Sequence, residues 1–497
     1  DASQLPPNAT LLFNFINGEF VDSVAENKKY IVNRNPATNQ INNYVTCSTR
    51  DDVHRAIEVA EKTFHSAAWK KFTVNDRSAI LSKIADELEK NQEELARLET
   101  MDTGKSINTS FHVDIDRAIA NFRFYAREIL QAPSLCHPME KPVHAINYTL
   151  RQPIGVCGLI APWNLPLYLL SWKIAPALAC GNTIVAKTSE FTPQTSQYLA
   201  KIIQGVGLPH GAFQLVHGLG AECGSAIVSH PSVEAISFTG GTQTGKVVGS
   251  IASGMLKKVS LECGGKNPLI VFDDADLDKA ADIAKRASFA NTGQVCLSPS
   301  RILVHESVHD AFVSRFVQLV TQGIKIGDPN DKSTVMGSLV SLPHRAKIEY
   351  YVALAKLEGG KIECGGKRPD SLPEEFKDGA FYEPTIISGL SIDSRTAMEE
   401  IFGCVCTVHK FKDEAEAIQM ANTSNYGLCA SVVTRDLSRA HRVSNKLHVG
   451  MVWVNGWLIR DLRVPFGGVK QSGVGREGGH YSLEFYSHDK NICIVVD

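Results

Sequence analysis

The stretch Gly155-Val-Cys-Gly-Leu-Ile-Ala161 decides the fold, because it opens a series of short apolar runs separated by helical patterns. Further runs of this kind follow at Thr183–Ala186, Phe213–Val216, Ala235–Phe238 and Val259–Leu261. Amphipathic segments fill the intervals, for example Thr195–Gln204 and Ala221–Ser229. Strands that alternate with helices are typical of a parallel sheet with helices on both faces. We therefore predict a doubly wound α/β domain in this region.

A second alternating series begins after Asn267. Helices are predicted within it at Leu277–Ala290 and Ser307–Val320. The strands predicted in this series are Leu269–Val271, Arg301–Val304, Val405–Val408, Cys429–Val433 and Met451–Val454. The predicted fold class is therefore α/β, with two doubly wound parallel-sheet domains.

The two ends of the chain differ from these series. The apolar spacing within Ile80–Leu88 and within Asp116–Leu130 predicts amphipathic helices in the N-terminal part. At the other end, Asn491–Val496 has the pattern of a strand with no obvious partner nearby. Such a strand often adds to the sheet of another subunit. We therefore predict a small β arm that serves oligomerisation.

The composition is typical of a globular protein that binds neither nucleic acid nor an anionic membrane. The 497 residues include 51 Lys and Arg against 53 Asp and Glu, a net charge of −2, so no basic surface is indicated. The twelve cysteines form no CxxC pair and no Cys/His spacing typical of a metal site. We therefore expect free thiols in a reducing cytoplasm, and no metal.

Neither a signal peptide nor a membrane span is predicted. Asp1–Asn14 lacks a positive stretch followed by an apolar one. The uncharged stretch Gln152–Trp172 is interrupted by Pro153, Pro162 and Pro166, whereas a bilayer helix needs about 20 mostly apolar residues without such breaks. We predict that this stretch is a strand running into a loop, and that the protein is soluble.

Three polar side chains near the predicted strands are candidates for catalysis. Cys296 ends the segment Phe289-Ala-Asn-Thr-Gly-Gln-Val-Cys296, where it is either a buried structural thiol or a nucleophile. Glu262 ends an apolar strand, and a partly desolvated carboxylate at that edge has a raised pKa suited to a general base. Asn164 lies between two prolines, where its amide either caps a turn or donates to an oxyanion.

The stretch Gly240-Gly-Thr-Gln-Thr-Gly245-Lys246-Val247 nearly matches a phosphate-binding P-loop. A P-loop needs Ser or Thr at the last position to hold magnesium, and Val247 cannot do this. No GxGxxG fingerprint follows the first strand either. These residues by themselves therefore do not identify a cofactor.

Taken together, the segments resemble the aldehyde dehydrogenase superfamily, in the family's order and over nearly the whole chain. The nucleophile, glutamate and oxyanion segments match at Asn291–Cys296, Leu261–Pro268 and Pro162–Pro166. Further matching segments are Ala186–Glu190, Ser237–Gly240, Glu399–Gly403 and Val464–Gly473. Because so many segments match in the same order, the chain is identified as a member of this superfamily.

The resemblance implies NAD-dependent oxidation of an aldehyde to a carboxylic acid. Cys296 would attack the aldehyde carbon as a thiolate, and the amide of Asn164 and the backbone N–H of Cys296 would hold the oxyanion. Hydride transfer to NAD would then leave a thioester on Cys296. Water activated by Glu262 would hydrolyse that thioester.

The resemblance also implies which residues bind NAD. Gly240–Gly245 would contact the pyrophosphate through a helix N-terminus. Lys187 and Glu190 would hold the adenosine ribose, and the Glu190 carboxylate would disfavour the 2′-phosphate of NADP. Glu399 and Phe402 would contact the nicotinamide and its ribose. The full predicted set is Ile160, Trp163, Lys187, Glu190, Gly220, Phe238, Gly240, Gly241, Gly245, Glu399 and Phe402.

Three positions depart from the family pattern. Thr188 and Cys404 each replace a proline, and Gly241 replaces a serine that can reach a phosphate. Loss of one such hydroxyl would weaken NAD binding by about 0.5–1.5 kcal/mol. The departures therefore bear on NAD affinity and leave the chemistry intact.

The family's arrangement implies domain boundaries. Residues 1–140 and 151–264 would form the NAD-binding domain, and residues 265–455 the catalytic domain with the nucleophile. Residues 141–150 and 482–497 would form the oligomerisation strands of a homodimer or homotetramer. Residues 456–481 would line the substrate site and the nicotinamide side.

The run Asn455–Phe466 resembles the branch that oxidises 2-aminomuconate and 2-hydroxymuconate semialdehydes, which in the former case implies tryptophan (kynurenine) catabolism. Arg460 and Arg117 match the two arginines that hold the substrate's remote carboxylate there, and an Arg fork suits bidentate carboxylate binding. Alternatively, Arg460 is a surface or interface residue.

Three other functions stay open. The alternatives are an enzyme that oxidises retinal or aliphatic aldehydes, an enzyme that oxidises betaine aldehyde, and a lens-crystallin-like protein without catalytic activity. A cationic aldehyde would suit an aromatic cage rather than Arg460. A crystallin would be expected to have lost Cys296, Glu262 or Asn164, and all three are present.

Overall fold

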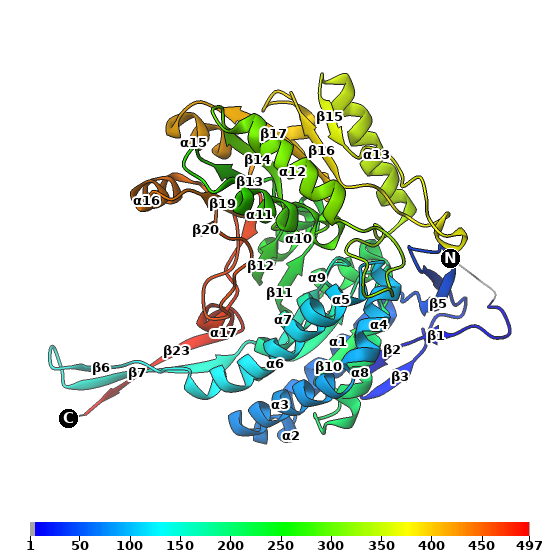
Figure 1. Cartoon of the computed structure of the whole chain (residues 1–497). Helices are drawn as coiled ribbons and strands as arrows, with labels where there is room; N and C mark the ends of the chain where they lie inside the picture. The colour runs from blue at the N-terminus through cyan, green and yellow to red at the C-terminus, as the bar shows by residue number, and fades with distance from the viewer. Residues whose placement is uncertain (1–4, 497) are drawn as a thin grey trace.

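The computed structural model describes residues 5–496, which form two large α/β units and a projecting β arm (Figure 1). The first large sheet has eight strands in the order β22-β12-β11-β8-β9-β10-β2-β3. Its parallel centre consists of β8 (Val156–Ile160), β9 (Thr183–Lys187), β10 (Phe213–Val216), β11 (Val233–Thr239) and β12 (Lys258–Glu262). All five strands predicted from Gly155 onward are therefore confirmed.

The antiparallel edges of this sheet come from distant parts of the chain. β2 (Asn14–Ile16) and β3 (Glu19–Val21) extend one side, and β22 (Gly473–Val474) pairs with β12 on the other. The pairing of β22 brings the C-terminal segment directly against the strand that ends in Glu262.

Helices pack on both faces of the first sheet. One face carries α1 (Arg50–His65), α9 (Ser225–Ser229) and α10 (Thr242–Gly254). The other carries α3 (Val74–Lys90), α6 (Asp116–Glu128), α7 (Pro166–Ala179) and α8 (Gln194–Gly205). The helix predicted at Ala221–Ser229 is divided, because a π-turn at η3 (Gly220–Gly224) precedes α9.

The structure corrects the prediction for Gln152–Trp172. The strand and loop are present, but α7 begins at Pro166, whose missing N–H suits the first turn of a helix. All fourteen residues of α7 are buried, so its sequence has no polar face that would reveal an amphipathic helix. No helix within residues 5–496 is long and apolar enough to cross a membrane.

The second large sheet has the order β15-β16-β17-β14-β13-β19-β20, and it is parallel except at β15. Its faces are covered by α11 (Leu277–Phe289), α12 (His309–Gly323) and α13 (Leu342–Leu357) on one side, and by α15 (Glu414–Asn422) and α16 (Leu437–Lys446) on the other. The strands are β13 (Asn267–Val271), β14 (Pro299–His305), β15 (Lys361–Cys364), β16 (Thr385–Ser388), β17 (Val405–Phe411), β19 (Cys429–Val433) and β20 (Met451–Val454). The predicted fold class, with two doubly wound sheets, is confirmed.

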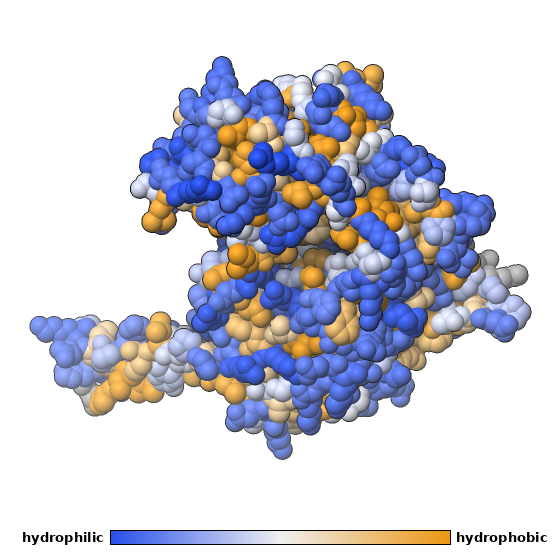
Figure 2. Space-filling view, in the orientation of Figure 1, coloured by the Kyte–Doolittle hydropathy of each residue, from blue (hydrophilic) through white to orange (hydrophobic). Residues whose placement is uncertain are grey.

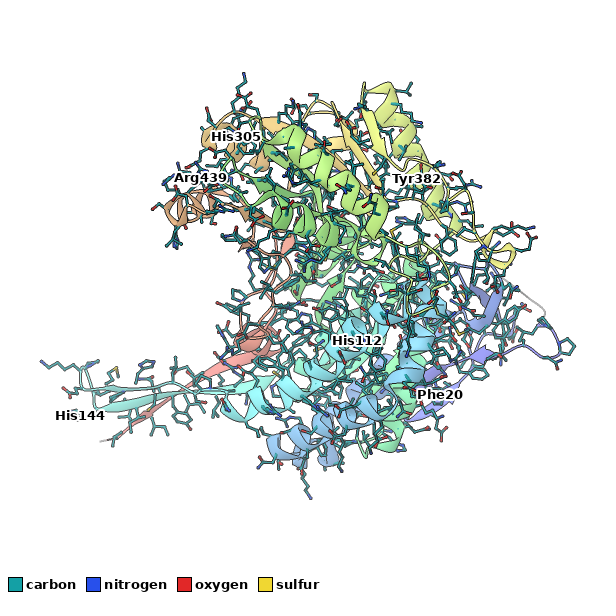
Figure 3. All side chains as sticks on the ribbon, in the orientation of Figure 1. Phe20, His112, His144, His305, Tyr382 and Arg439 are labelled. Atoms are coloured by element: carbon teal, nitrogen blue, oxygen red, sulfur yellow. The ribbon has the colours of Figure 1, made fainter. Side chains whose placement is uncertain are left out.

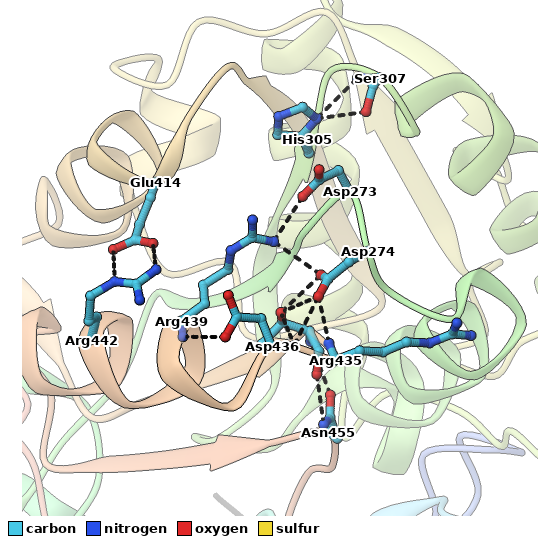
Figure 4. A network of polar contacts seen from close by, with 11 residues as sticks. Asp273, Asp274, His305, Ser307, Glu414, Arg435, Asp436, Arg439, Arg442 and Asn455 are labelled. Carbon is cyan, nitrogen blue, oxygen red and sulfur yellow. Dashed lines mark hydrogen bonds and ion pairs between the residues drawn. The ribbon is translucent and has the colours of Figure 1, made fainter.

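At the ends of β13 and β19, the carboxyl edge of the second sheet is occupied by the chain's own side chains (Figure 4). Asp274, which follows β13, accepts hydrogen bonds from the Thr434 hydroxyl and from the backbone N–H groups of Arg435 and Asp436. Arg439 bonds both Asp273 and Asp274. Open α/β sheets commonly bind ligands at this edge. Here the hydrogen-bond donors that a ligand would use already donate to the carboxylate of Asp274.

The β arm is a three-stranded antiparallel sheet of β6 (Cys136–Met139), β7 (Ala145–Pro153) and β23 (Ser487–Val495). The prediction that Asn491–Val496 has no partner nearby is wrong, because β23 pairs with β7 over nine residues of the same chain. The predicted strand boundaries also shift, since residues up to Phe485 belong to α17 (Gly479–Phe485). His144 marks the region near the tip of the arm (Figure 3).

Shorter elements complete the described chain. A three-stranded sheet contains β1 (Leu11–Leu12), β4 (Tyr30–Arg34) and β5 (Ile41–Thr46), and a two-stranded one contains β18 (Tyr426–Gly427) and β21 (Val469–Lys470). The short helices are α2 (Ala67–Lys71), α4 (Gln92–Thr103), α5 (Ile107–Thr109), η1 (Ser110–Ile115), η2 (Ile129–Gln131), η4 (Ala290–Gly293), η5 (Glu374–Phe376) and α14 (Arg395–Met398).

Candidate active site

Cys296 lies in the loop between η4 and β14. Just before it, Asn291 and Thr292 adopt left-handed backbone conformations, with φ of 50° and 57°, which are uncommon for residues with a Cβ atom. The Asn267 amide donates to the Cys296 carbonyl at 2.7 Å. The Cys296 side chain is half-buried against Val295, Leu297 and neighbouring apolar residues. The loop is therefore held by specific contacts rather than by regular structure.

Glu262 ends β12 beside this loop. The Cys296 thiol donates to the Glu262 carboxylate, with Sγ 3.6 Å from Oε1. The other oxygen, Oε2, is buried and has no hydrogen-bond partner within residues 5–496. Burial, followed by the negative charge of Glu477, raises the pKa of Glu262 to about 7. A carboxyl group with this pKa can accept and release a proton near neutral pH.

Glu477 was missed by sequence reasoning, because its local sequence contains no signal for a buried acid. Its carboxylate accepts from Lys173 Nζ at 3.1 Å and from the Trp172 indole at 2.6 Å. Both donors belong to α7, the helix that the sequence did not predict. The Lys173 ammonium also donates to the hydroxyl of Ser237 at 2.8 Å. Glu262 therefore faces an organised buried polar cluster.

Asn164 is buried near the end of the loop between β8 and α7, and it contacts the loop that carries Cys296. Its side-chain Nδ2 donates to the backbone carbonyl of Gln294 at 2.9 Å. An amide nitrogen carries two N–H donors, so one remains for another acceptor. The three predicted catalytic side chains are thus brought together from separate parts of the chain.

Cys296 and Glu262 line two cavities at once. One, of about 440 Å³, extends toward Tyr168, Trp457 and Arg460. The other, of about 230 Å³, is lined by Trp163, Gly240 and Phe402 among others. A more open groove of about 670 Å³, around His309 and His409, shares no lining residue with either cavity. The pair therefore lies where two molecules can meet.

The smaller cavity has the features of a dinucleotide site. It includes the N-terminal end of α10, where Gly240 and Gly241 expose backbone. The buried hydroxyls of Thr239 and Thr242 have no partner among the described residues. The Phe238 ring lies so close to Gly240 that a Cβ atom there would stand 2.6 Å from it. Free donors at a helix N-terminus fit a pyrophosphate.

The remaining predicted cofactor residues lie along the same edge of the first sheet. Lys187 ends β9, and its Nζ lies 3.9 Å from the Glu190 carboxylate. Ile160 ends β8, and Gly220 begins η3. Gly245 leaves room for Cys263, whose Sγ would lie 2.5 Å from an added Cβ atom. Their common edge is the one where parallel sheets bind nucleotides.

Arg460 lies in the larger cavity with Cys296. Its guanidinium is sandwiched between the rings of Trp172 and Phe466, at 4.2 and 4.0 Å from the ring centroids. Nη1 donates to the Tyr168 hydroxyl at 3.0 Å. Nη2 is buried and has no partner in the described part of the chain. The cavity thus contains a preoriented cation with an unused donor.

Arg117 does not line the larger cavity. Its guanidinium carbon lies 5.9 Å from the Tyr168 ring centroid, next to the residue that bonds Arg460. The structure therefore places Arg117 one side chain away from the predicted substrate contact.

Comparison with known proteins assigns the family. The model of the aldehyde dehydrogenase family matches residues 21–492. The chain belongs to this family. A 2-aminomuconic semialdehyde dehydrogenase of Danio rerio is 44% identical over 97% of this chain and 98% of the relative. A betaine aldehyde dehydrogenase of Bacillus subtilis (strain 168) is 42% identical over 96% of each. The NAD+ complex of a Bacillus cereus aldehyde dehydrogenase matches with TM-score 0.94 and 37% identity, over 98% of this chain and 97% of that one.

One predicted cofactor residue of this aldehyde dehydrogenase is corrected by the structure. The Glu399 carboxylate bonds Arg395 and the Tyr351 hydroxyl, and it does not line the smaller cavity. The next residue, Glu400, lines that cavity and accepts from the backbone N–H of Gly265 at 2.8 Å. Two adjacent glutamates cannot be distinguished by motif alone, because their side chains point in different directions.

The departures from the aldehyde dehydrogenase pattern fit their surroundings. The hydroxyl oxygens of Thr188 and Ser196 are 3.2 Å apart. Cys404 is buried, and its thiol donates to the Tyr382 carbonyl at 3.8 Å. A Cβ atom at Gly241 would meet nothing within 4 Å. Gly241 therefore leaves open space where a serine side chain would stand.

Proposed function

We propose that this enzyme oxidises a semialdehyde with a remote carboxylate, such as 2-aminomuconate semialdehyde, to the dicarboxylate through a thioester on Cys296. The observation that carries the proposal is Arg460, which lines the same cavity as Cys296 and whose buried Nη2 has no hydrogen-bond partner within residues 5–496. A buried donor without a partner costs about 1–3 kcal/mol. A substrate carboxylate there would remove that cost.

The catalytic roles follow from the geometry. Cys296 passes its proton to Glu262, which already accepts its hydrogen bond, and the thiolate attacks the aldehyde carbon. The free amide N–H of Asn164 and the backbone N–H of Cys296 stabilise the oxyanion. NAD, when bound, accepts the hydride. Glu262 releases the first proton to solvent and, as a carboxylate again, takes a proton from water. That water attacks the thioester, so that the carboxylic acid is released and the Cys296 thiolate leaves.

NAD is proposed as the cofactor, in preference to NADP. The open N-terminus of α10 and the Thr239 hydroxyl, which has no partner among the described residues, fit the pyrophosphate. Lys187 and Glu190 stand at the sheet edge where the adenosine ribose would lie. The Glu190 carboxylate accepts from ribose hydroxyls and repels a 2′-phosphate. Glu400 replaces Glu399 as the proposed partner of the nicotinamide ribose.

Charge favours a carboxylated substrate over the alternatives. Arg460 would repel the cationic group of betaine aldehyde, and Lys285 and Arg286 also line the larger cavity. An aliphatic aldehyde would leave the guanidinium without a partner. The presence of Cys296, Glu262 and Asn164 argues against a silent crystallin, and formation of NADH from any aldehyde would exclude it.

The proposed assembly is a homodimer or homotetramer in the cytoplasm. Apolar side chains remain exposed along the arm, as Figure 2 shows, including Ile146, Leu150, Ile494 and Val495. Exposed apolar strands favour pairing with another copy. All twelve cysteines are free, which suits a reducing compartment.

Substitution of Arg460 tests the substrate. Arg460→Ala should lower kcat/KM for a carboxylated semialdehyde by about 10–150-fold, the value of a charge-assisted contact. Hexanal should be unaffected, and Arg460→Lys should recover only part of the loss, because a point charge lacks the fork geometry. The matched control is Arg463→Ala, since Arg463 is exposed and paired with Asp461. Equal losses with both substrates would contradict the assignment.

A further inference from the structure

A buried lysine contacts the backbone of the proposed oxyanion donor. The Lys105 ammonium donates to the carbonyl of Asn164 at 2.8 Å. It also pairs with the Asp114 carboxylate, and the two side chains are 1% and 0% exposed. Asp114 belongs to the π-helix η1, in which His112 is labelled in Figure 3. Burying an ion pair costs desolvation free energy unless its geometry and hydrogen bonds compensate. A buried pair at this place therefore suggests a functional role.

The carbonyl of Asn164 also receives a second donor. Asn291, in the nucleophile loop, donates its amide to the same oxygen at 3.0 Å. The side chain of Asn164 in turn donates to Gln294 in that loop at 2.9 Å. Lys105 therefore fixes one face of a peptide whose other contacts belong to the loop carrying Cys296.

The first turn of α7, which follows Asn164, is held by a second buried acid of the same region. Glu99, on α4, accepts from the backbone N–H of Leu167 at 3.4 Å and from the Thr195 hydroxyl at 2.7 Å. Burial, with the charge of Asp114 nearby, raises the pKa of Glu99 to about 8. The peptide of Asn164 and the helix turn that follows it are thus held by groups from α4 and the segment after it.

We propose that Lys105, braced by Asp114, is a positioning residue that sets the Asn164 amide at the place where the oxyanion forms. The inference rests on the proposed oxyanion role of Asn164. Lys105 touches neither substrate nor cofactor and acts through the peptide of Asn164. If its contact is lost, the peptide can rotate and carry Nδ2 away from the reacting carbonyl.

A double-mutant cycle on the full-length enzyme tests this. Lys105→Met, Asn164→Ala and the double variant are compared by the single-turnover rate of NADH formation with saturating NAD and aldehyde. Asn164→Ala should slow this rate about 100–1000-fold, and Lys105→Met about 10–100-fold. The double variant should be no slower than Asn164→Ala, because Lys105 acts only through Asn164. KM for aldehyde and NAD should change little.

Alkylation of Cys296 by iodoacetamide supplies a readout that a general loss of structure would move. Alkylation forms no oxyanion, so Lys105→Met should react at the wild-type rate. Lys257→Met is the matched control, since Lys257 also donates to a backbone carbonyl, that of His230, at the opposite end of β12. This control should leave the single-turnover rate unchanged.

The outcomes separate the two proposals. If Asn164→Ala does not slow hydride transfer, the oxyanion assignment fails. The positioning role is contradicted if Asn164→Ala slows hydride transfer and Lys105→Met slows the Asn164→Ala enzyme further. It is also contradicted if Lys105→Met slows alkylation of Cys296 to the same extent as hydride transfer. Should Lys105→Met fail to fold, Asp114→Asn takes its place, because asparagine has nearly the same shape as aspartate. We expect Asp114→Asn to slow the single-turnover rate less than Lys105→Met, and to have no further effect when Asn164 is already alanine.

Discussion

The sulfur of Cys296 lies 3.6 Å from an oxygen of Glu262, and this thiol–carboxylate contact joins the two cavities of the site. Burial and the neighbouring Glu262 charge hold the pKa of Cys296 well above its usual value. The resting enzyme therefore keeps a protonated nucleophile next to its base. Proton transfer between the two requires no rearrangement of the loop.

The pH dependence of turnover should report Glu262. Its pKa is about 7, and only the deprotonated carboxylate can activate water. The value of kcat should therefore rise with pH through neutrality and fall about tenfold for each unit below it. Glu262→Gln should remove this dependence together with most of the activity. A profile with no inflection between acid and neutral pH would contradict the assignment.

Adjacent glutamates provide a matched pair for the cofactor site. Glu400→Ala should weaken NAD binding by about 10–150-fold if its carboxylate bonds the ribose. Glu399→Ala should change it by less than about fivefold, because its pair with the exposed Arg395 is at the surface. Isothermal titration with NAD measures both. A larger loss of NAD affinity in Glu399→Ala than in Glu400→Ala would instead support Glu399, the residue chosen from the motif.

Tyr168 should influence selectivity through Arg460. Tyr168→Phe removes the hydroxyl that Arg460 Nη1 contacts at 3.0 Å, so the guanidinium loses one restraint. We expect kcat/KM for a carboxylated semialdehyde to fall about 2–13-fold, the value of one hydrogen bond, and that for hexanal to stay unchanged. A loss common to both substrates would mean that Tyr168 shapes the cavity instead.

The arm predicts the assembly state. Ile146 and Ile494 face each other across β7 and β23, and they are 42% and 50% exposed. Ile146→Asp with Ile494→Asp should shift the protein toward monomer in sedimentation velocity, because charges would oppose burial of the arm. Val74→Asp, at a similarly exposed site on α3, is the control. An unchanged sedimentation coefficient would show that the arm is not an interface.

The strands, and three residues that the fold brings together at the candidate active site, could be predicted from the sequence for physical reasons. The central strands of both sheets are buried on two sides, so they appear in the sequence as short apolar runs such as Val156–Ile160 and Cys429–Val433. Cys296 and Asn164 occur in distinctive loop motifs, and Glu262 is the last residue of the apolar strand β12.

Other features depend on tertiary contacts that leave no local pattern. The fully buried α7 has no amphipathic spacing. Lys105 and Glu477 are charged residues of the kind usually exposed, and only folding places them under Asn164 and beside Glu262. The choice between Glu399 and Glu400 depends on side-chain direction, and the pairing of β23 with β7 joins segments more than 300 residues apart.

The most direct test of the account is the fate of Cys296 in the Glu262→Ala enzyme. Mixed with NAD and aldehyde, this variant should still release close to one NADH per site, because hydride transfer does not need water. The release should be slower than in the wild type, because the Cys296 thiol must lose its proton to solvent instead of to Glu262. Steady turnover should then fall by about 10²–10⁴-fold, the usual contribution of a general base. Mass spectrometry of the intact protein should find an acyl group, mapped by proteolysis to Cys296, and Cys296→Ala should give neither burst nor adduct. Full steady turnover without an adduct, or an adduct on another residue, would contradict the thioester on Cys296.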